Sequence, residues 1–325
     1  MKEKIKQIIL GASKIVILRH QWPDFDALGS QYGLAKIIEA QSTANQQVFI
    51  GGGKPVNLKD FGWSNHNLTR ASFENALLIV VDTADSKRID VGEVDFKTAD
   101  IFKLAKQVIK IDHHPQLKDD GYPIDTLRLV DTSVSSCSEL LAELFDVNGR
   151  DFDQEILKYL YTGIIGDTGR LSYGFSSQTL AVLAELLANQ ELQPFADINH
   201  SFGVTSLEEA RMKGYYYDNL VVKDDTAWLI IDQKTLSKYA WPANQMAIFV
   251  NILGTIRGVA KWVLCIQYED SSWRLRVRSQ NIDISGLARE YGGGGHPFAS
   301  GVNLPASTQI SQLEEFIGKL ITIKK

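Results

Sequence analysis

The chain has 325 residues, of which 44% are hydrophobic and 22% are charged. This length exceeds what one hydrophobic core usually supports, so we expect two folded domains and exclude a disordered chain. No apolar run approaches the ~18 residues that cross a bilayer, which argues against a membrane protein. The two cysteines, Cys137 and Cys265, lie far apart and lack a CxxC partner, which favours a reducing cytoplasm over a disulfide framework.

Charge is distributed unevenly along the chain. Residues 1–215 hold 22 Lys and Arg against 29 Asp and Glu, a net charge of −7, whereas residues 216–325 have a net charge of +2. A protein that binds long duplex nucleic acid usually presents a basic face that neutralises many phosphates. Because the sequence shows no such basic run, we expect any phosphate-bearing partner to be small.

Three short apolar runs, rich in β-branched residues, lie in the first half at 14–20, 76–82 and 108–114. Their nearly continuous hydrophobicity predicts strands that are buried on both faces of a parallel sheet. A helical pattern at 27–40 alternates with them. The sequence therefore predicts an α/β domain with a mainly parallel sheet flanked by helices.

The pattern becomes helical after residue 135 and changes again in the second half. Helices are predicted over 135–145, 154–165, 177–189, 207–219 and 309–323. Strands are predicted over 227–231, 258–268 and 273–279, with Glu269–Ser272 as the turn of a hairpin. We expect a first domain over 1–190, a helical linker over 191–215 and a smaller α/β domain over 216–325.

Acidic residues and histidines follow each of the three predicted parallel strands. In chain order they are His20, Asp24 and Asp26 after the first strand, Asp82 at the end of the second, and Asp112, His113 and His114 at the end of the third. Binding sites in open α/β sheets form at the carboxyl ends of the strands, so these side chains are expected to meet at one edge. Asp167, which follows a predicted helix, is a further candidate.

Carboxylates and imidazoles without thiolates suit Mn²⁺, Mg²⁺, Fe²⁺ or Zn²⁺. Two such ions about 3.5–4 Å apart need a bridging carboxylate and can clamp both oxygens of an in-line phosphoryl displacement. Each residue alone has an ordinary explanation, since Asp24 or Asp26 can cap a helix and Asp82 can form a turn. Because four of the six histidines fall within motif-like clusters, the set as a whole favours a metal centre.

The ordered motifs resemble those of a known family. HQWPDFDALGS (20–30), VDT (81–83), DHHP (112–115) and GDTG (166–169) are similar to the four phosphoesterase motifs of the DHH superfamily. RVRS (276–279) and GGGGHPFASG (292–301) resemble the signature of the DHHA1 domain. The chain thus resembles the DHH/DHHA1 phosphoesterase family, and its length and spacing are most similar to the nanoRNase/pAp phosphatase branch.

The resemblance implies a set of metal ligands and catalytic residues. One metal would be held by His20, Asp24 and Asp82, and the other by Asp26, Asp82, His113 and Asp167, with Asp82 bridging. Asp112 would orient a histidine, and His114 would face the scissile phosphate as the candidate acid. Two divalent ions, with Mn²⁺ as the first choice and Mg²⁺ or Fe²⁺ as alternatives, would support metal-activated hydroxide attack on phosphorus.

Substrate-binding candidates lie near the C-terminus. Arg276 and Arg278 alternate along a predicted strand and so face the same side, and arginine suits bidentate phosphate binding. A solvated hairpin face and a flexible glycine linker are the ordinary alternatives, although glycines also let backbone N–H groups approach an anion. The resemblance favours substrate binding by Arg278, Gly294, Gly295 and His296, with Arg276 as a further candidate. We expect one phosphate at the metals and the nucleotide end on the second domain.

The resemblance implies hydrolysis of short oligoribonucleotides to 5′-mononucleotides, of 3′-phosphoadenosine 5′-phosphate (pAp) to AMP, or of both. The alternatives are a phosphodiesterase for the linear dinucleotide pApA or cyclic di-AMP, a DHH-type inorganic pyrophosphatase, and a nucleotide-sensing module without turnover. GGGGHPFASG argues against the pyrophosphatase, and the complete motif set argues against the sensing module. Short RNA or nucleotides are the expected partners, and the sequence leaves a homodimer open.

Overall fold

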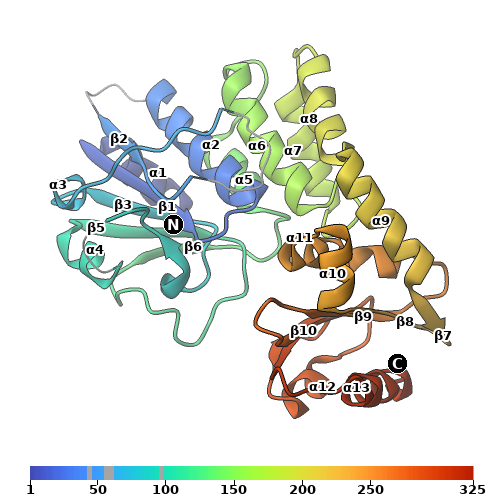
Figure 1. The fold of residues 1–325 in the computed structure, drawn as a ribbon. Helices are drawn as coiled ribbons and strands as arrows, with labels where there is room; N and C mark the ends of the chain where they lie inside the picture. Colours follow the sequence, from blue (N-terminus) through green and yellow to red (C-terminus); the bar gives the residue numbers. More distant parts are fainter. Residues whose placement is uncertain (42–45, 55–61, 95–97, 325) are drawn as a thin grey trace. The chain divides into compact units, whose positions relative to one another are not determined.

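A computed structural model describes residues 1–41, 46–54, 62–94 and 98–324. The chain divides into two compact units, Met1–Val204 and Thr205–Lys325, and each contains its own sheet (Figure 1). The segment that we expected to link two domains contains the last helix of the first unit, α8 (Gln193–Gly203), and the start of the first helix of the second, α9 (Leu207–Asn219).

The first unit contains a sheet with the strand order β2-β1-β3-β5-β6, and all four of these neighbouring pairs are parallel. Its strands are β1 (Lys14–His20), β2 (Gln47–Ile50), β3 (Leu77–Val81), β5 (Gln107–Asp112) and β6 (Leu127–Val130). A short strand, β4 (Ile89–Asp90), pairs antiparallel with the end of β1. The predicted mainly parallel sheet is confirmed, and the three apolar runs form its central strands.

Helices cover both faces of this sheet, which explains why its central strands are apolar throughout. Ile15 and Ile17 of β1 pack into a core that includes residues of α8 and of the helices given next, and Val16 and Leu18 pack into a second core on the opposite face. The first core includes residues of α1 (Lys2–Gly11), α2 (Phe25–Gln41), α5 (Cys137–Phe145), α6 (Gln154–Asp167) and α7 (Ser177–Leu187). The second face is covered by α3 (Arg70–Phe73) and α4 (Thr98–Leu104).

The second unit is a sheet of order β11-β12-β10-β9-β8-β7, in which only the β8–β9 pair is parallel among the described strands. Its strands are β7 (Val221–Lys223), β8 (Thr226–Ile231), β9 (Lys261–Gln267), β10 (Trp273–Ser279), β11 (Gly294–His296) and β12 (Ala299–Leu304). The predicted hairpin at Glu269–Ser272 joins the antiparallel strands β9 and β10.

Separate groups of helices pack on the two faces of this second sheet (Figure 1). One face packs against α9, α10 (Gln233–Tyr239), α11 (Ala243–Ile248) and the 3₁₀ segment Phe249–Thr255. The other face packs against α12 (Ser285–Glu290) and α13 (Ile310–Thr322). Apolar and polar residues alternate along β10, so its arginines point away from the core beneath α13.

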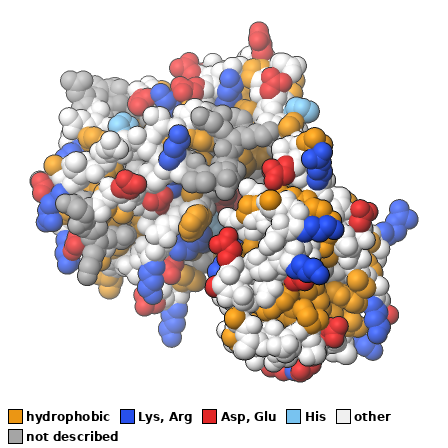
Figure 2. Space-filling model, viewed as in Figure 1, with side chains coloured by type: hydrophobic (Ala, Val, Ile, Leu, Met, Phe, Trp, Pro, Cys, Tyr) orange, Lys and Arg blue, Asp and Glu red, His pale blue; other side chains and the backbone are white. Residues whose placement is uncertain are grey.

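The surface has mixed charge on the side shown in Figure 2, where Lys and Arg side chains are scattered among Asp and Glu side chains. Such a surface is unlike the continuous basic face of a protein that binds long duplexes. In the part of the chain that the structure describes, no helix has the length and apolar character needed to span a membrane.

Candidate metal centre

Three neighbouring parallel strands of the first sheet present polar side chains at one edge. His20 is the last residue of β1, Asp82 directly follows β3, and Asp112 is the last residue of β5. Asp26 lies in the first turn of α2, and Asp167 is the last residue of α6. The carboxyl ends of these strands therefore meet the ends of two helices.

The six side chains predicted as metal ligands come together in two groups. The first is His20, Asp24 and Asp82, and the second is Asp26, His113 and Asp167; within each group the potential ligand atoms lie within 4.8 Å of one another. His20 Nε2 lies 3.7 Å from Asp24 Oδ2 and 3.5 Å from Asp82 Oδ2. In the second group, His113 Nε2 lies 3.9 Å from Asp26 Oδ2 and 3.5 Å from Asp167 Oδ2.

Asp82 connects the two groups through its two carboxylate oxygens. Oδ2 lies 3.5 Å from His20 Nε2, whereas Oδ1 lies 3.4 Å from His113 Nε2. The side chain is buried, and Oδ1 accepts no hydrogen bond from the residues that the structure describes. A buried carboxylate oxygen without a donor is costly unless a cation compensates it. This atom therefore fits contact with a metal ion, and the carboxylate as a whole faces both groups.

The backbone of Asp82 is also unusual, since its φ is 50°. Non-glycine residues adopt this left-handed conformation rarely, and Asp tolerates it better than most because its short side chain can bond locally. Such conformations cluster at functional sites, where the surrounding structure maintains them. The turn after β3 thus holds the shared carboxylate in one orientation.

Asp26 is fixed by the N-terminus of α5, a contact that the sequence analysis missed. Its carboxylate accepts hydrogen bonds from the backbone N–H groups of Cys137 (2.7 Å) and Ser138 (2.9 Å). The helix begins after Ser136, whose hydroxyl accepts from the N–H of Glu139, and this Ser-x-x-Glu spacing was the available sequence signal. The contact requires Gly163, because an added Cβ there would lie 2.8 Å from Asp26 Oδ1.

His20 and His114 each have one ring nitrogen fixed by a hydrogen bond. His20 Nδ1 lies 2.7 Å from the carbonyl oxygen of Gln21, to which it can only donate, so Nε2 is left to face the carboxylates. His114 Nδ1 lies 2.8 Å from Asp112 Oδ1. Histidines that bind metals commonly donate their other N–H in this way, which fixes the ring.

Asp112 lies behind the histidines and outside the three potential ligand groups. Its Oδ1 accepts from the backbone N–H groups of His113 (3.0 Å) and His114 (3.2 Å) in addition to the His114 ring. His114 forms a third potential ligand group with Asp82 and His113. However, its Nδ1 donates to Asp112, so Nε2 is the ring atom that is available for substrate.

Negative charge dominates the electrostatics of the centre. Burial alone would lower the pKa of His20, but the carboxylates of Asp24 and Asp82 outweigh it and raise this pKa to about 10. Burial is likewise outweighed at His113, whose pKa rises to about 10 beside Asp82. Burial raises the pKa of Asp167 to about 6 and that of Asp26 well above its usual range. The raised pKa values mean that these side chains hold protons, which offset the excess negative charge of the carboxylates. Divalent cations would offset the same charge when bound.

Four of the five predicted substrate residues of the second unit lie on one face of its sheet, namely Arg276, Arg278, Gly294 and His296. Arg276 pairs with Gly301, which in turn pairs with Gly294, and Arg278 is likewise connected to His296 through Ala299. Residues opposite one another on neighbouring strands point to the same side. The small residues between the arginines and β11 leave this face open.

Glycine is required at position 295, which lies between Gly294 and His296 and pairs with Ser300. Gly295 has a φ of 136°, and an added Cβ would lie 2.5 Å from the carbonyl oxygen of Ala299. Arg278 donates to the carbonyl oxygens of Val277 (2.9 Å) and Ser300 (3.3 Å), so its side chain is already oriented along the sheet. Burial, with the nearby charge of Arg276, lowers the pKa of Arg278. Arg276 and Arg278 thus concentrate positive charge on β10, which is separated from β11 by the single strand β12.

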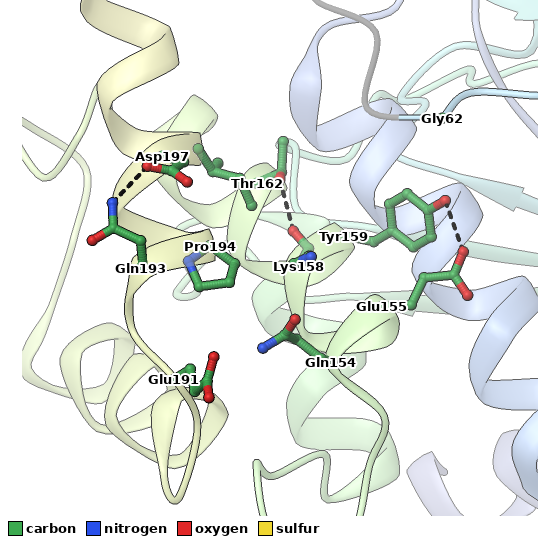
Figure 3. Close-up of a pocket in the computed structure, with 11 residues that line it drawn as sticks. Gly62, Gln154, Glu155, Lys158, Tyr159, Thr162, Glu191, Gln193, Pro194 and Asp197 are labelled. Carbon is green, nitrogen blue, oxygen red and sulfur yellow. Dashed lines mark hydrogen bonds between the residues drawn. The ribbon is translucent and has the colours of Figure 1, made fainter.

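A separate hollow of about 960 Å³ lies between α6 and α8 and contains none of the predicted ligands (Figure 3). Its polar groups pair with one another, since Gln193 donates to Asp197 (2.7 Å) and Tyr159 donates to Glu155 (3.3 Å). Three carboxylates and one ammonium line it, namely those of Glu155, Glu191, Asp197 and Lys158. This acidic lining disfavours a phosphate, and its carboxylates belong to none of the potential metal-ligand groups found among the described residues.

The chain matches two protein-family models and is similar to known proteins over nearly its whole length. The family model for the DHH family, N-terminal domain, matches residues 14–164, and the model for the DHHA1 domain matches residues 229–323. A bifunctional oligoribonuclease and PAP phosphatase NrnA of Bacillus subtilis is 33% identical, over 94% of this chain and 93% of that protein. A probable protein of the same name from Streptococcus mutans is 31% identical, over 96% of this chain and 95% of that protein.

A solved structure, that of an exopolyphosphatase-related protein from Bacteroides fragilis, shares the fold with a TM-score of 0.81. It is 23% identical and covers 98% of this chain and 95% of its own. The fold and the groups of potential ligands are those of a metal-dependent phosphoesterase. The chain belongs to the DHH family, with a DHHA1 domain as its second domain, and the resemblance to the nanoRNase/pAp phosphatase branch is confirmed.

Proposed function

We propose that the chain is a two-metal phosphoesterase that hydrolyses short oligoribonucleotides to 5′-mononucleotides and pAp to AMP. The relatives from B. subtilis and S. mutans, whose names state both activities, align with nearly the whole chain. The observation that supports the two-metal arrangement most directly is the position of Asp82, whose two oxygens face different ligand groups.

The donor set supports Mn²⁺ as the bound metal. His20, Asp24 and Asp82 would hold one ion, and Asp26, Asp82, His113 and Asp167 would hold the other. Oxygen and imidazole donors without a thiolate suit Mn²⁺, and also Mg²⁺ or Fe²⁺. When bound, two such ions supply Lewis acidity and lower the pKa of coordinated water toward neutrality.

His114 and Asp112 are proposed to assist departure of the leaving oxygen. The side chain of His114 is 39% exposed, so its ring can meet a substrate, while Asp112 fixes it from behind. The carboxylate of Asp112 raises the pKa of His114 against the opposing effect of burial. A protonated imidazole that is held in this way can donate a proton from Nε2 to the leaving oxygen.

The second unit is proposed to bind a phosphate or nucleotide end that is remote from the reacting phosphorus. Arg276 and Arg278 provide guanidinium groups, and Gly294 and Gly295 lie across the sheet beside His296. Arginine binds phosphate through two parallel hydrogen bonds, and open glycine backbone allows close approach of an anion. Contacts of this kind select short substrates that carry a phosphate at the correct spacing.

A cytoplasmic location is proposed as well, because both cysteines are free and buried. Buried thiols are compatible with a reducing compartment, where disulfides are rare.

The test is a substrate panel with the full chain and Mn²⁺, with products resolved by size. The panel contains a diribonucleotide, a pentaribonucleotide, pAp, pApA, cyclic di-AMP and pyrophosphate. Release of 5′-mononucleotides from the short RNAs, together with AMP from pAp, is the expected result. Exclusive cleavage of cyclic di-AMP or pyrophosphate would replace the proposal with one of those activities.

A further inference from the structure

Trp22 lies in the loop between β1 and α2, two residues from each of the proposed ligands His20 and Asp24. Trp22 is 86% exposed, whereas the other five tryptophans of the chain are buried or half-buried. A large aromatic surface left in water contributes nothing to the core, and such surfaces mark binding sites when they adjoin a functional centre. Its exposure beside two proposed ligand residues, rather than exposure alone, makes Trp22 a candidate for contact with the substrate.

The backbone at Trp22 has a φ of 56°. Bulky residues adopt this left-handed conformation rarely, and they retain it where the surrounding structure imposes it. The loop is held on both sides of Trp22. The N–H of Gln21 donates to the carbonyl oxygen of Arg88 (2.6 Å), and Asp24 Oδ1 accepts from the N–H groups of Asp26 (3.1 Å) and Ala27 (2.9 Å). The hydrogen bonds on both sides therefore hold the backbone of Trp22 in place, while its indole is exposed to solvent.

The loop also keeps the backbone of Trp22 close to the proposed ligand residues. His20 Nε2 and Asp24 Oδ2 are 3.7 Å apart, so the chain leaves and re-enters the centre within four residues. Since successive Cα atoms are about 3.8 Å apart, the Cα of Trp22 lies within about 7.6 Å of the Cα atoms of both residues. A nucleotide whose phosphate is bound at the centre would extend its sugar and base over a comparable distance.

We propose that Trp22 is a stacking platform for the nucleobase next to the phosphate bound at the metal centre. This rests on the proposed function, because it requires a nucleotide substrate. Every base has a π face, so stacking on an indole favours nucleotides over other phosphoesters without selecting one base. Trp22 thus adds recognition of the base to the phosphate recognition that metal ions held by the ligand residues would supply.

The backbone conformation allows a variant that separates binding from folding. Glycine adopts a positive φ readily, so Trp22→Gly removes the indole and relieves the unfavourable conformation in one step. If the indole served the fold, the variant would melt at a lower temperature. The proposal predicts a melting temperature equal to or above that of the wild type. Trp22→Phe is the conservative variant, because it retains an aromatic face. Ile124→Ala is the matched control, because it removes the side chain of an apolar residue that is 99% exposed and that precedes β6, an edge strand of the sheet.

The experiment compares binding of AMP and ribose 5-phosphate to the Mn²⁺-loaded full chain by calorimetry. These ligands differ only in the base, and neither needs turnover. We expect the wild type and Ile124→Ala to bind AMP about tenfold or more tightly than ribose 5-phosphate. Trp22→Gly should lose most of that difference through weaker AMP binding, with unchanged affinity for ribose 5-phosphate, and Trp22→Phe should keep most of it.

Three outcomes would overturn the assignment of Trp22. They are equal affinity of the wild type for both ligands, an undiminished AMP preference in Trp22→Gly, and equal weakening of both ligands in that variant. The last would mean that Trp22 supports the loop rather than the base. Failure of the proposed function would appear separately, as a wild type that cleaves no member of the substrate panel.

Discussion

Asp112 accepts a hydrogen bond from His114 Nδ1 over 2.8 Å, and the same oxygen also accepts from the backbone N–H of His114. This arrangement fixes the ring from behind and leaves Nε2 for the substrate. In metal sites, mutation of a residue that orients a histidine in this way typically lowers metal affinity or activity by about 10- to 100-fold. The relationship supports the proposal that Asp112 positions His114.

Asp112→Ala should therefore lower kcat by roughly 10- to 100-fold. Metal content should change little, because Asp112 contacts His113 only through the backbone N–H and lies outside the ligand groups. Asp112→Asn, which keeps an acceptor oxygen, should recover part of the loss. Steady-state kinetics together with metal analysis checks this, and a kcat near that of the wild type in Asp112→Ala would refute the positioning role.

Lys110 lies beneath the centre as a fully buried ammonium. It lies 3.4 Å from Asp112 Oδ2 and 3.6 Å from Asp120 Oδ2, and it donates to the carbonyl oxygen of Ala84 (2.8 Å). Removing one partner of a buried ion pair leaves an uncompensated charge, at a cost of about 3–5 kcal/mol. Lys110→Met should lower the free energy of unfolding by about this amount in urea titrations.

Lys103→Met is the matched control for that variant. Lys103 is 78% exposed and pairs with Asp100 at 3.4 Å on the surface of α4, where a salt bridge contributes little. Its free energy of unfolding should stay within about 0.5 kcal/mol of the wild type. Equal stabilities of the two lysine variants would show that Lys110 does not compensate buried carboxylates.

The metal-free protein should lose stability as pH rises from 7 to 10. The pKa values of His20 and His113 are about 10 in the folded chain, against about 6.5 for an ordinary histidine. A raised folded-state pKa contributes stability that is complete below the unfolded value and lost as pH rises through the folded value. The melting temperature of chelated protein, measured across this range, should therefore fall.

Metal reverses the sign of this dependence. The histidines proposed as ligands must be neutral to bind an ion, so metal binding would release protons and strengthen as pH rises. The melting temperature with saturating Mn²⁺ should hold or rise between pH 7 and 8.5, before hydroxide precipitation intervenes. A chelated protein that becomes more stable toward pH 10 would contradict the charge balance described for the centre.

Arg278→Ala should raise KM for nucleotide substrates with little change in kcat, because its proposed partner is remote from the reacting phosphorus. Arg274→Ala is the control, since Arg274 lies on the same strand but stacks over the ring of Tyr268, at 3.9 Å. A roughly tenfold or larger increase in KM for Arg278→Ala alone is expected, equivalent to about 1.4 kcal/mol. A large loss of kcat at unchanged KM would place Arg278 at the reacting centre instead.

The sequence predicted the parts of this molecule that follow from periodicity and strand order. The apolar runs before His20, Asp82 and His113 are buried on both faces of a parallel sheet, and this burial requires continuous hydrophobicity. Because parallel strands end at one edge, the meeting of these side chains was predictable as well. The short strands β2, β4 and β6 were not predicted, since two to four residues are too few to show a period.

Contacts between distant segments were beyond sequence reasoning. The N–H groups at the start of α5 hold Asp26 from more than a hundred residues away, and no local pattern specifies that partner. The positive φ angles of Asp82 and Trp22 could not be predicted from the sequence either, because neither residue is glycine. Both features depend on how the helices pack beside the sheet.

The sharing of Asp82 between two ions is the central claim, and the number of Mn²⁺ ions bound per chain tests it most directly. Asp82→Asn is the suitable variant, because Asn tolerates a left-handed backbone and keeps the shape of the side chain. Metal analysis after desalting should give two ions per chain for the wild type and at most one for Asp82→Asn. A wild type that holds a single ion, or a variant that retains two, would contradict the account.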